Sequence, residues 1–149
     1  MTRSIEVIAR AVIILDRRVV LARRKGAAYT FLPGGHIEFG EPAETALARE
    51  LEEELGVSVV IGRFLGAVEN GWTDAIGAFH ELNLVFAANI RDLTSGGAIP
   101  SKEPHLEFVW AWMHQLDRQI LMPPILTTLI PEWIEFGPTP CWASTLENS

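Results

Sequence analysis

Apolar runs separated by turn residues predict a chain that is rich in β-strands. The run IEVIARAVIIL at 5–15 is expected to form a strand, and a turn at Asp16 and Arg17 leads to a second strand near 18–24. Two such runs joined by a tight connection predict a β-hairpin. The stretch at 78–90 is continuously apolar toward its end, which favours a buried central strand. Further strands are expected at 57–69 and 106–113.

One segment, 42–55, follows a helical period instead. Its leucines recur every four residues and form an apolar stripe that would face a core. Pro42 suits the first helical position, where its missing N–H costs no intrahelical hydrogen bond. Gly56 stands where a left-handed C-terminal cap is expected. The stripe consists of Leu47, Leu51 and Leu55.

The remaining segments are assigned from their prolines and glycines. Residues 114–120 are expected to form a short helix, and 125–134 a second long helix that Pro131 kinks or divides. Residues 136–149 contain two prolines and little periodicity, so we expect a C-terminal tail or an edge-packing extension. The segment NGWTDAIGA at 70–78 is polar and contains glycine, and we interpret it as a substrate-facing loop. Further loops are expected at 27–35 and 91–105.

Composition bounds the class of protein. The chain has 149 residues, of which 48% are hydrophobic, and this length suffices for one packed domain. We therefore expect a single domain over 1–149. The one cysteine, Cys141, excludes an internal disulfide and a cysteine-based zinc site. No apolar run is long enough to span a bilayer, and the start of the sequence lacks a signal-peptide pattern, so a cytoplasmic location is expected.

Charge narrows the classes of partner. The net charge is −7, so broad attraction to nucleic acid or to an anionic membrane is not expected. Positive charge is nevertheless concentrated at both ends of the second strand, between Arg17 and Lys25. This pattern suits either a small phosphorylated ligand or the charged ends that keep a hairpin soluble. Within it, Arg24 is expected to contact a phosphate, since it ends a strand that leads toward the acidic segment.

Three glutamates share one side of the predicted helix, next to its apolar stripe. Glu50, Glu53 and Glu54 are three and four residues apart, so their carboxylates repel one another unless a cation binds among them. Ala43 and Ala46 lie on the same side and leave room for a ligand. Carboxylate oxygens favour Mg²⁺ or Mn²⁺ over softer metals. A glutamate stripe can also be an ordinary solvated face, and spacing alone leaves this alternative open.

The segment from Gly35 to Val57 resembles the Nudix box, G-x5-E-x7-R-E-U-x-E-E-x-G-U, in which U is an aliphatic residue. Every defined position matches in one register, so the signal is far more specific than an isolated acidic motif. The chain is identified as a member of the Nudix hydrolase family, of the MutT-like type. The resemblance implies an α/β/α sandwich with a mixed β-sheet and flanking helices. The matching residues are Gly35, Glu41, Arg49, Glu50, Leu51, Glu53, Glu54, Gly56 and Val57.

The resemblance also implies roles for individual residues. Glu53 would orient or deprotonate water, and Arg49 and Glu41 would support the site through salt bridges. The metal, Mg²⁺ or Mn²⁺, would be held by three carboxylates and one backbone carbonyl. These ligands are Glu50, Glu53, Glu54 and Gly34.

A further acid outside the box acts as base or ligand in many members of the family. Glu103, just before a predicted strand, is the first choice here, Glu107 is the second, and Glu69 is a further candidate. Trp72 and Phe39 are candidates to stack on a base or sugar of the substrate, although large aromatic residues are core residues at least as often.

The function implied is metal-dependent hydrolysis of the pyrophosphate linkage in a nucleoside diphosphate joined to another moiety. Nucleoside triphosphates, ADP-ribose, sugar nucleotides, dinucleoside polyphosphates and NADH-type dinucleotides all fit this description. Two alternatives stay open. One is a Nudix-fold module that binds a nucleotide or metabolite without turnover, although the box is intact. The other is removal of pyrophosphate from RNA 5′ ends, against which the acidic net charge argues. A homodimer is also suggested, since many members of the family pair.

Overall fold

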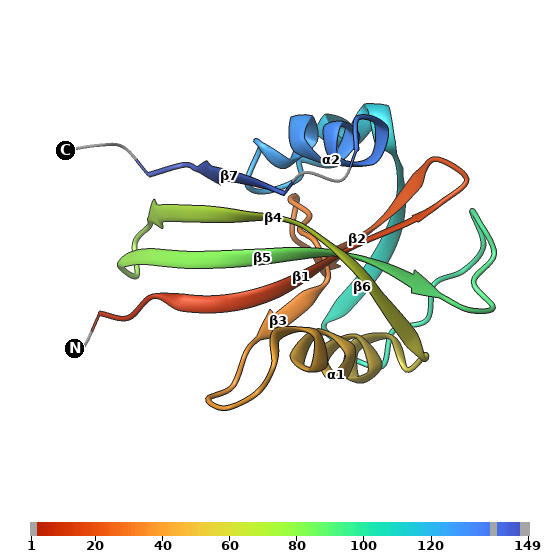
Figure 1. Ribbon diagram of the computed structural model, residues 1–149, viewed down its shortest axis with the longest axis horizontal. Coiled ribbons are helices and arrows are strands. Elements are labelled where there is room, and N and C mark those ends of the chain that lie inside the picture. The colour runs from red at the N-terminus through yellow and green to blue at the C-terminus, as the bar shows by residue number, and fades with distance from the viewer. Residues whose placement is uncertain (1–2, 138–139, 147–149) are drawn as a thin grey trace.

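The computed structural model describes residues 3–137 and 140–146. Its strands are β1 (Glu6–Leu15), β2 (Arg18–Arg24), β3 (Gly34–His36), β4 (Val59–Thr73), β5 (Ala78–Ile90), β6 (Leu106–Trp112) and β7 (Cys141–Ser144). Its helices are α1 (Ala43–Leu55), the 3₁₀-helix η1 (Met113–Gln119) and α2 (Leu126–Glu135). The strands form one sheet in the order β6-β2-β1-β5-β4-β7, and β3 pairs with β1 beside this path (Figure 1). The β1–β5 and β4–β7 pairs are parallel and the others are antiparallel, so the sheet is mixed.

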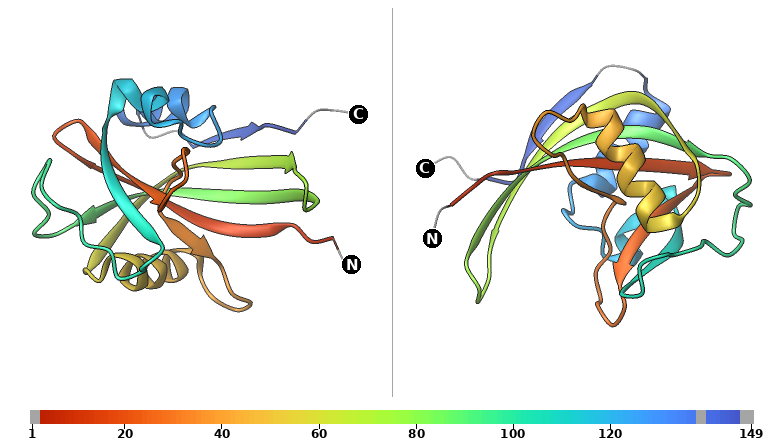
Figure 2. Two further views of the ribbon diagram at one scale, coloured as in Figure 1. Left: turned by 180° about the vertical axis from the view of Figure 1, so that it is seen from behind. Right: turned by 90° about the horizontal axis from the view of Figure 1, so that it is seen from below.

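The helices cover opposite faces of this sheet (Figure 2). On one face, α1 packs Leu47 and Leu51 into a buried cluster with Phe86 of β5. On the other face, α2 contributes Leu129 and Trp133 to a second buried cluster. The predicted α/β/α sandwich with a mixed sheet and flanking helices is therefore confirmed. Among the described residues, no helix combines the length and apolar character needed to cross a membrane.

The predicted hairpin and central strand are present. Asp16 and Arg17 form the turn between β1 and β2, with φ angles of 50° and 64°. β5 lies between β1 and β4, and its residues from Glu81 to Ala88 are buried or half-buried. The continuous apolar run of this strand thus reflects cover on both faces of the sheet.

Helix α1 differs from its prediction at one end. Pro42 has φ −62° and ψ 144°, so it is the extended residue before the helix, which begins at Ala43. A proline there still fits, because its missing N–H would have no intrahelical partner. At the other end Gly56 has φ 72° and its N–H donates to the carbonyl of Glu52, which confirms the left-handed cap.

The interpretation of 70–78 as a loop is wrong for most of its length. Strand β4 continues to Thr73 and pairs with β5, so that Trp72 lies opposite Phe79; only a short turn connects the two strands. Gly71 and the polar residues beside it concealed the strand. Leu146 packs where a Cβ on Gly71 would lie, so the glycine accommodates a neighbouring segment and does not end the strand.

The C-terminal third contains the two predicted helices and an edge strand. The short helix is a 3₁₀-helix, interrupted at Gln115, where φ is −134°. Helix α2 runs through Pro131 undivided. Within 136–149, which was expected to be a tail or an edge-packing extension, β7 pairs in parallel with β4. Residues 138–139 and 147–149 of that segment lie outside the described residues, and a one-domain organisation stays a prediction.

Candidate active site

The acidic helix meets the sheet at the diglycine turn. Gly34 pairs with Arg10 of β1 and has a φ of 148°, and a Cβ at this position would overlap the backbone of Ala9. The side chain of Glu50 lies against Gly35, where a Cβ would overlap it. Both glycines are therefore required by close approach: one to the neighbouring strand, the other to a carboxylate of α1.

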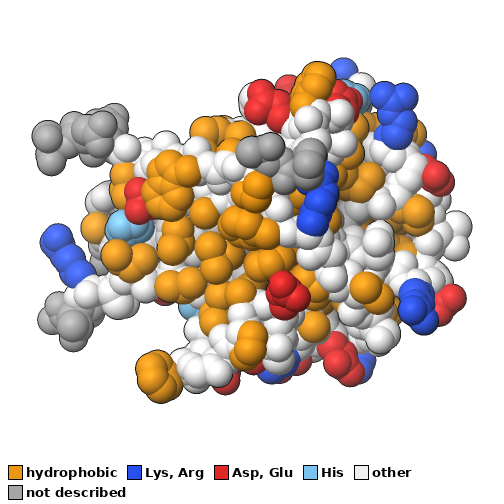
Figure 3. Space-filling model, in the orientation of Figure 1, with side chains coloured by type: hydrophobic (Ala, Val, Ile, Leu, Met, Phe, Trp, Pro, Cys, Tyr) orange, Lys and Arg blue, Asp and Glu red, His pale blue; other side chains and the backbone are white. Residues whose placement is uncertain are grey.

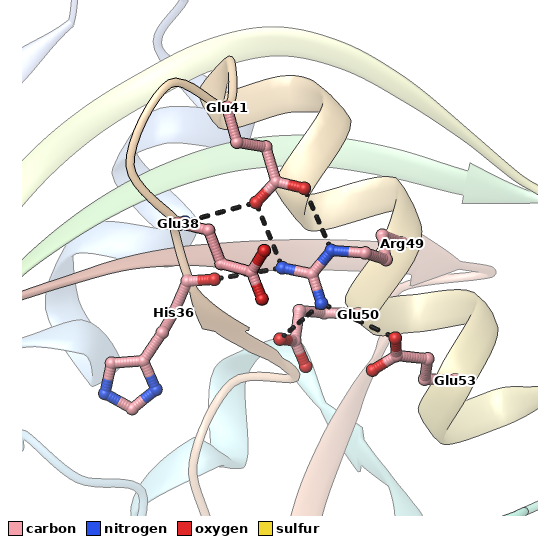
Figure 4. A network of polar contacts seen from close by, with 6 residues as sticks. All are labelled: His36, Glu38, Glu41, Arg49, Glu50 and Glu53. Carbon is pink, nitrogen blue, oxygen red and sulfur yellow. Dashed lines mark hydrogen bonds and ion pairs between the residues drawn. The ribbon is translucent and has the colours of Figure 1, made fainter.

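Arg49 binds several of the acidic residues (Figure 4). Its Nε and Nη2 donate to the two carboxylate oxygens of Glu41 at 2.9 and 3.0 Å. Nη1 donates to Glu50 at 3.0 Å and lies 3.5 Å from Glu53, and Nη2 also donates to the carbonyl of His36 at 3.2 Å. Hydrogen bonds from Arg49 hold the pKa of Glu41 below its ordinary value. This arrangement joins the start of α1, the box glutamates and the turn before the helix.

Glu54 is the buried member of the acidic set. Only 9% of the residue is exposed, and its Oε2 has no hydrogen-bond partner. Burial raises the pKa of Glu54 to about 8, and the negative charge of Glu50 adds to the rise. The positive charge of Arg10 and the N–H of Gly34 act in the opposite direction. A buried carboxylate with a free oxygen beside a second carboxylate is favourable when a cation binds there.

The donor set fits a hard divalent cation, although the side chains are not closed around one. Within 3–137 and 140–146, no group of three or more acidic, histidine or cysteine side chains has a metal-binding arrangement. Glu53 is the most exposed of the three box glutamates, with 55% of its side chain accessible, and Arg49 lies between it and Glu50. All the available donors are oxygens, which suits Mg²⁺ or Mn²⁺.

A distant loop is fixed at the C-terminal end of α1. The N–H of Lys102 donates to the carbonyl of Glu54 at 2.8 Å, and the Lys102 side chain packs over Gly56. The next residue is Glu103, whose negative charge contributes to the raised pKa of Glu54. Glu107, by contrast, accepts a hydrogen bond from Arg23 at 2.8 Å on the neighbouring strands. Of the two loop acids considered from the sequence, the structure brings Glu103 to the box glutamates.

Two other predicted residues lie on exposed segments. Arg24 ends β2 opposite Leu106 and is exposed, with no ion pair among the described residues. It is thus on the strand next to the one that the Glu103 loop enters. Phe39 is fully exposed in the segment between β3 and α1. Both side chains are accessible to a ligand.

The remaining candidates lie on the long β4–β5 hairpin. Trp72 stacks on Phe79 with 5.1 Å between ring centroids, so one face of its ring is covered by the protein. Its exposure is 41%, which leaves part of the ring accessible. Glu69 accepts a hydrogen bond from Ser144 at 2.9 Å and lies 3.2 Å from His80. The carboxylate of Glu69 is therefore engaged within the sheet.

The sequence analysis missed a polar group behind the diglycine turn. Arg10 donates to Asn83 Oδ1 at 3.0 Å and to the carbonyl of Leu32 at 3.0 Å, and it lies 3.9 Å from Glu81. Burial lowers the pKa of Arg10, opposed chiefly by the charge of Glu81. A signal was present, because each of these polar residues interrupts an apolar strand. Only the fold reveals that they meet.

The sandwich, with a glutamate-bearing helix packed on a diglycine turn, defines a protein of the Nudix class. The NUDIX domain model matches residues 6–132, and the chain therefore belongs to the NUDIX family. A MutT NUDIX hydrolase from Burkholderia pseudomallei is 30% identical, with a TM-score of 0.62 over 76% of this chain and 88% of that one. A NUDIX hydrolase from Nitrosomonas europaea shares the fold at 22% identity, with a TM-score of 0.68 over 88% of this chain and 89% of that one.

Two curated relatives match over shorter stretches. An ADP-ribose pyrophosphatase of Methanocaldococcus jannaschii is 32% identical over 78 residues, which are 50% of this chain and 45% of that protein. A MutT-like protein of Streptomyces ambofaciens is 36% identical over 63 residues, which are 42% of this chain and 41% of that protein. The matched region thus spans less than half the length of either curated relative.

Proposed function

We propose that this protein is a metal-dependent hydrolase that cleaves the pyrophosphate linkage of a nucleoside diphosphate joined to another moiety. The observation that carries the proposal is the buried Glu54 carboxylate, whose Oε2 has no partner, beside Glu50 at the diglycine turn. A purely structural acid at this position would be unfavourable, because its charge is neither solvated nor paired. A ligand that carries positive charge removes that cost.

Each residue of the site has a proposed part in the reaction. Mg²⁺ or Mn²⁺ would be held by the three box glutamates and the backbone carbonyl of Gly34. When bound, such an ion neutralises phosphate charge and lowers the pKa of water. Glu53 is exposed enough to orient or accept a proton from water. Glu103, on the loop that contacts the end of α1, is the second candidate for this proton transfer.

Two basic or hydrogen-bonding groups would organise the site around these acids. Arg49 fixes the rotamers of Glu41 and Glu50 and offsets repulsion between Glu50 and Glu53. Arg24 is proposed to contact a phosphate, because it is exposed on the strand beside the Glu103 loop. Trp72 is proposed to stack on a base or sugar through the accessible part of its ring.

The proposed substrate is a small nucleotide rather than a nucleic acid. Similarity to an ADP-ribose pyrophosphatase supports starting with ADP-ribose, and similarity to a MutT-like protein supports including nucleoside triphosphates. The net charge of −7 disfavours RNA 5′ ends as substrates. A homodimer is also proposed, and sedimentation analysis measures the oligomeric state. Apolar side chains gathered over part of the sheet surface offer one surface for such pairing (Figure 3).

A product screen tests this function directly. The panel contains ADP-ribose, nucleoside triphosphates, sugar nucleotides, dinucleoside polyphosphates and NADH, each with Mg²⁺, with Mn²⁺ and with EDTA. The expected result is cleavage of one class that requires the metal and gives a nucleoside monophosphate product. Binding of one class with no cleavage under any condition would favour the alternative of a binding module and contradict the hydrolase.

A further inference from the structure

A polar network lies within the sheet immediately behind the diglycine turn. Arg10 is in the middle of β1, where its neighbours in the sheet are Gly34 on one side and Val85 on the other. Only 17% of its side chain is exposed. The guanidinium borders a small cavity whose other walls include Val68 and Leu126, so it lies on an otherwise apolar face.

Three residues hold the guanidinium in one orientation. Nε donates to Asn83 Oδ1 at 3.0 Å, and Cζ lies 5.7 Å from the centre of the Phe31 ring. Glu81 lies 3.9 Å from Nη2. Asn83 is itself oriented, because its amide donates to Glu81 and to the carbonyl of Val68, each at 3.2 Å. The rotamer of Arg10 is therefore determined by its neighbours and not by solvent.

The group that Arg10 holds is the backbone just before the diglycine turn. Nη1 donates to the carbonyl of Leu32 at 3.0 Å. Two residues further on, Gly34 is pressed against Ala9, and the N–H of Ala11 donates to the carbonyl of Pro33 at 2.9 Å. Arg10 thus adds a side-chain hydrogen bond to a strand pair that is only three residues long in β3.

A charged residue in this place is costly unless it has a specific use. Replacing Arg10, Glu81 and Asn83 by apolar residues would extend the buried cluster on this face, and buried ionic groups seldom add stability over a well-packed apolar alternative. What the apolar alternative could not supply is a donor for the Leu32 carbonyl. The network is therefore better explained by the turn it anchors than by the stability of the core.

We propose that Arg10 is a positioning residue for the metal site, acting through the Leu32 carbonyl to fix the backbone of Gly34 and Gly35. The inference rests on the proposed function, since it assigns a purpose to the geometry of that site. Arg10 does not contact the box glutamates in this role. It sets the position of the carbonyl and of the surface against which Glu50 lies.

The test compares Arg10→Lys and Arg10→Met with the unsubstituted chain in the absence of substrate. Lysine keeps the charge but cannot bind Asn83 and the Leu32 carbonyl together. Both variants are expected to bind Mn²⁺ about 10- to 100-fold more weakly by calorimetry, the usual effect of losing a group that orients metal ligands. Amide exchange at Ala11, whose N–H pairs with the turn, is expected to accelerate in both.

A matched control is Arg63→Met. Arg63 also donates to backbone carbonyls, those of Trp133 at 2.8 Å and Gly137 at 3.3 Å, but makes no contact with the turn. This variant is expected to bind Mn²⁺ like the unsubstituted chain. Circular dichroism of each variant establishes that it is folded. If Arg10→Met does not fold, Arg10→Lys carries the test.

The outcomes separate the inference from the proposed function. Unchanged Mn²⁺ affinity and unchanged Ala11 exchange in Arg10→Lys would overturn the positioning role while leaving the metal site intact. Unchanged Mn²⁺ affinity with a raised KM for substrate would also overturn it, because Arg10 would then contact the substrate directly. No Mn²⁺ binding by the unsubstituted chain would overturn the metal site and, with it, the role of Arg10.

Discussion

Replacing Glu54 by glutamine should stabilise the metal-free protein at neutral pH and change it little in acid. In the folded chain the carboxyl has a pKa of about 8, whereas its ordinary value is 4.5. Between these values the folded state binds more protons than the unfolded state, so stability falls as pH rises from 4.5 to 8. The glutamine variant has no proton to lose and does not pay this cost.

The magnitude follows from the two pKa values. Each pH step above the ordinary value costs about 1.4 kcal/mol while the folded carboxyl stays protonated, so the cost at pH 7 is up to about 3 kcal/mol. At pH 4.5 it is below about 0.5 kcal/mol by the same relation. Glu54→Gln should therefore raise the free energy of unfolding by up to about 3 kcal/mol at pH 7 and very little at pH 4.5.

Urea unfolding in EDTA at pH 4.5, 6 and 7 measures this difference. Glu52→Gln is the matched control, because Glu52 is exposed on the same helix and its substitution should have little effect at any of these pH values. Added Mn²⁺ should stabilise the unsubstituted chain more than the Glu54→Gln chain, because binding to the folded state raises its stability. A stabilisation of equal size at pH 4.5 and pH 7, or none at pH 7, would refute the reasoning.

Three further substitutions examine the rest of the site. Glu53→Gln should reduce metal-dependent turnover at least about 100-fold with an unchanged circular dichroism spectrum, as expected when an acid–base group is lost; turnover near that of the unsubstituted chain would contradict the assignment. Glu103→Gln should lower kcat more than it changes KM, whereas Glu107→Gln should leave kcat within about twofold, since surface substitutions away from such features have small effects; the reverse pattern in steady-state kinetics would make Glu107 the loop acid. Gly35→Ala should displace Glu50, weaken Mn²⁺ binding by about 10-fold or more, and cost about 1–3 kcal/mol in thermal unfolding; an alanine variant that binds Mn²⁺ normally would show that the close approach is not required.

Periodicity and local chemistry determined the elements that form the site. The leucine stripe, the glutamates beside it and the cap at Gly56 are set by residues within one helical turn of one another, so α1 could be located to within one residue at its start. The apolar runs likewise located the hairpin and the central strand. These features depend on local backbone preference and on alternation between buried and exposed positions, both of which are written along the chain.

Tertiary pairing hid one strand and revealed another. Polar and glycine residues around Trp72 read as a loop, yet ladder hydrogen bonds to β5 extend β4 through them. The C-terminal segment has too little periodicity for a prediction, but β7 pairs with the free edge of β4. In both places the partner strand supplies hydrogen bonds that local propensity does not encode.

The sequence by itself determined which residues could bind a metal: it supplied the Gly35–Val57 motif, and the family model confirms the class to which that motif belongs. The tertiary structure alone decided what surrounds those residues. It buried Glu54 without a partner, brought the loop of Glu103 to the end of α1, and placed Arg10 behind the turn. The reason is that helix periodicity acts over a few residues. Burial, long-range charge and hydrogen bonds across the sheet join residues tens of positions apart, and exist only once the chain has folded.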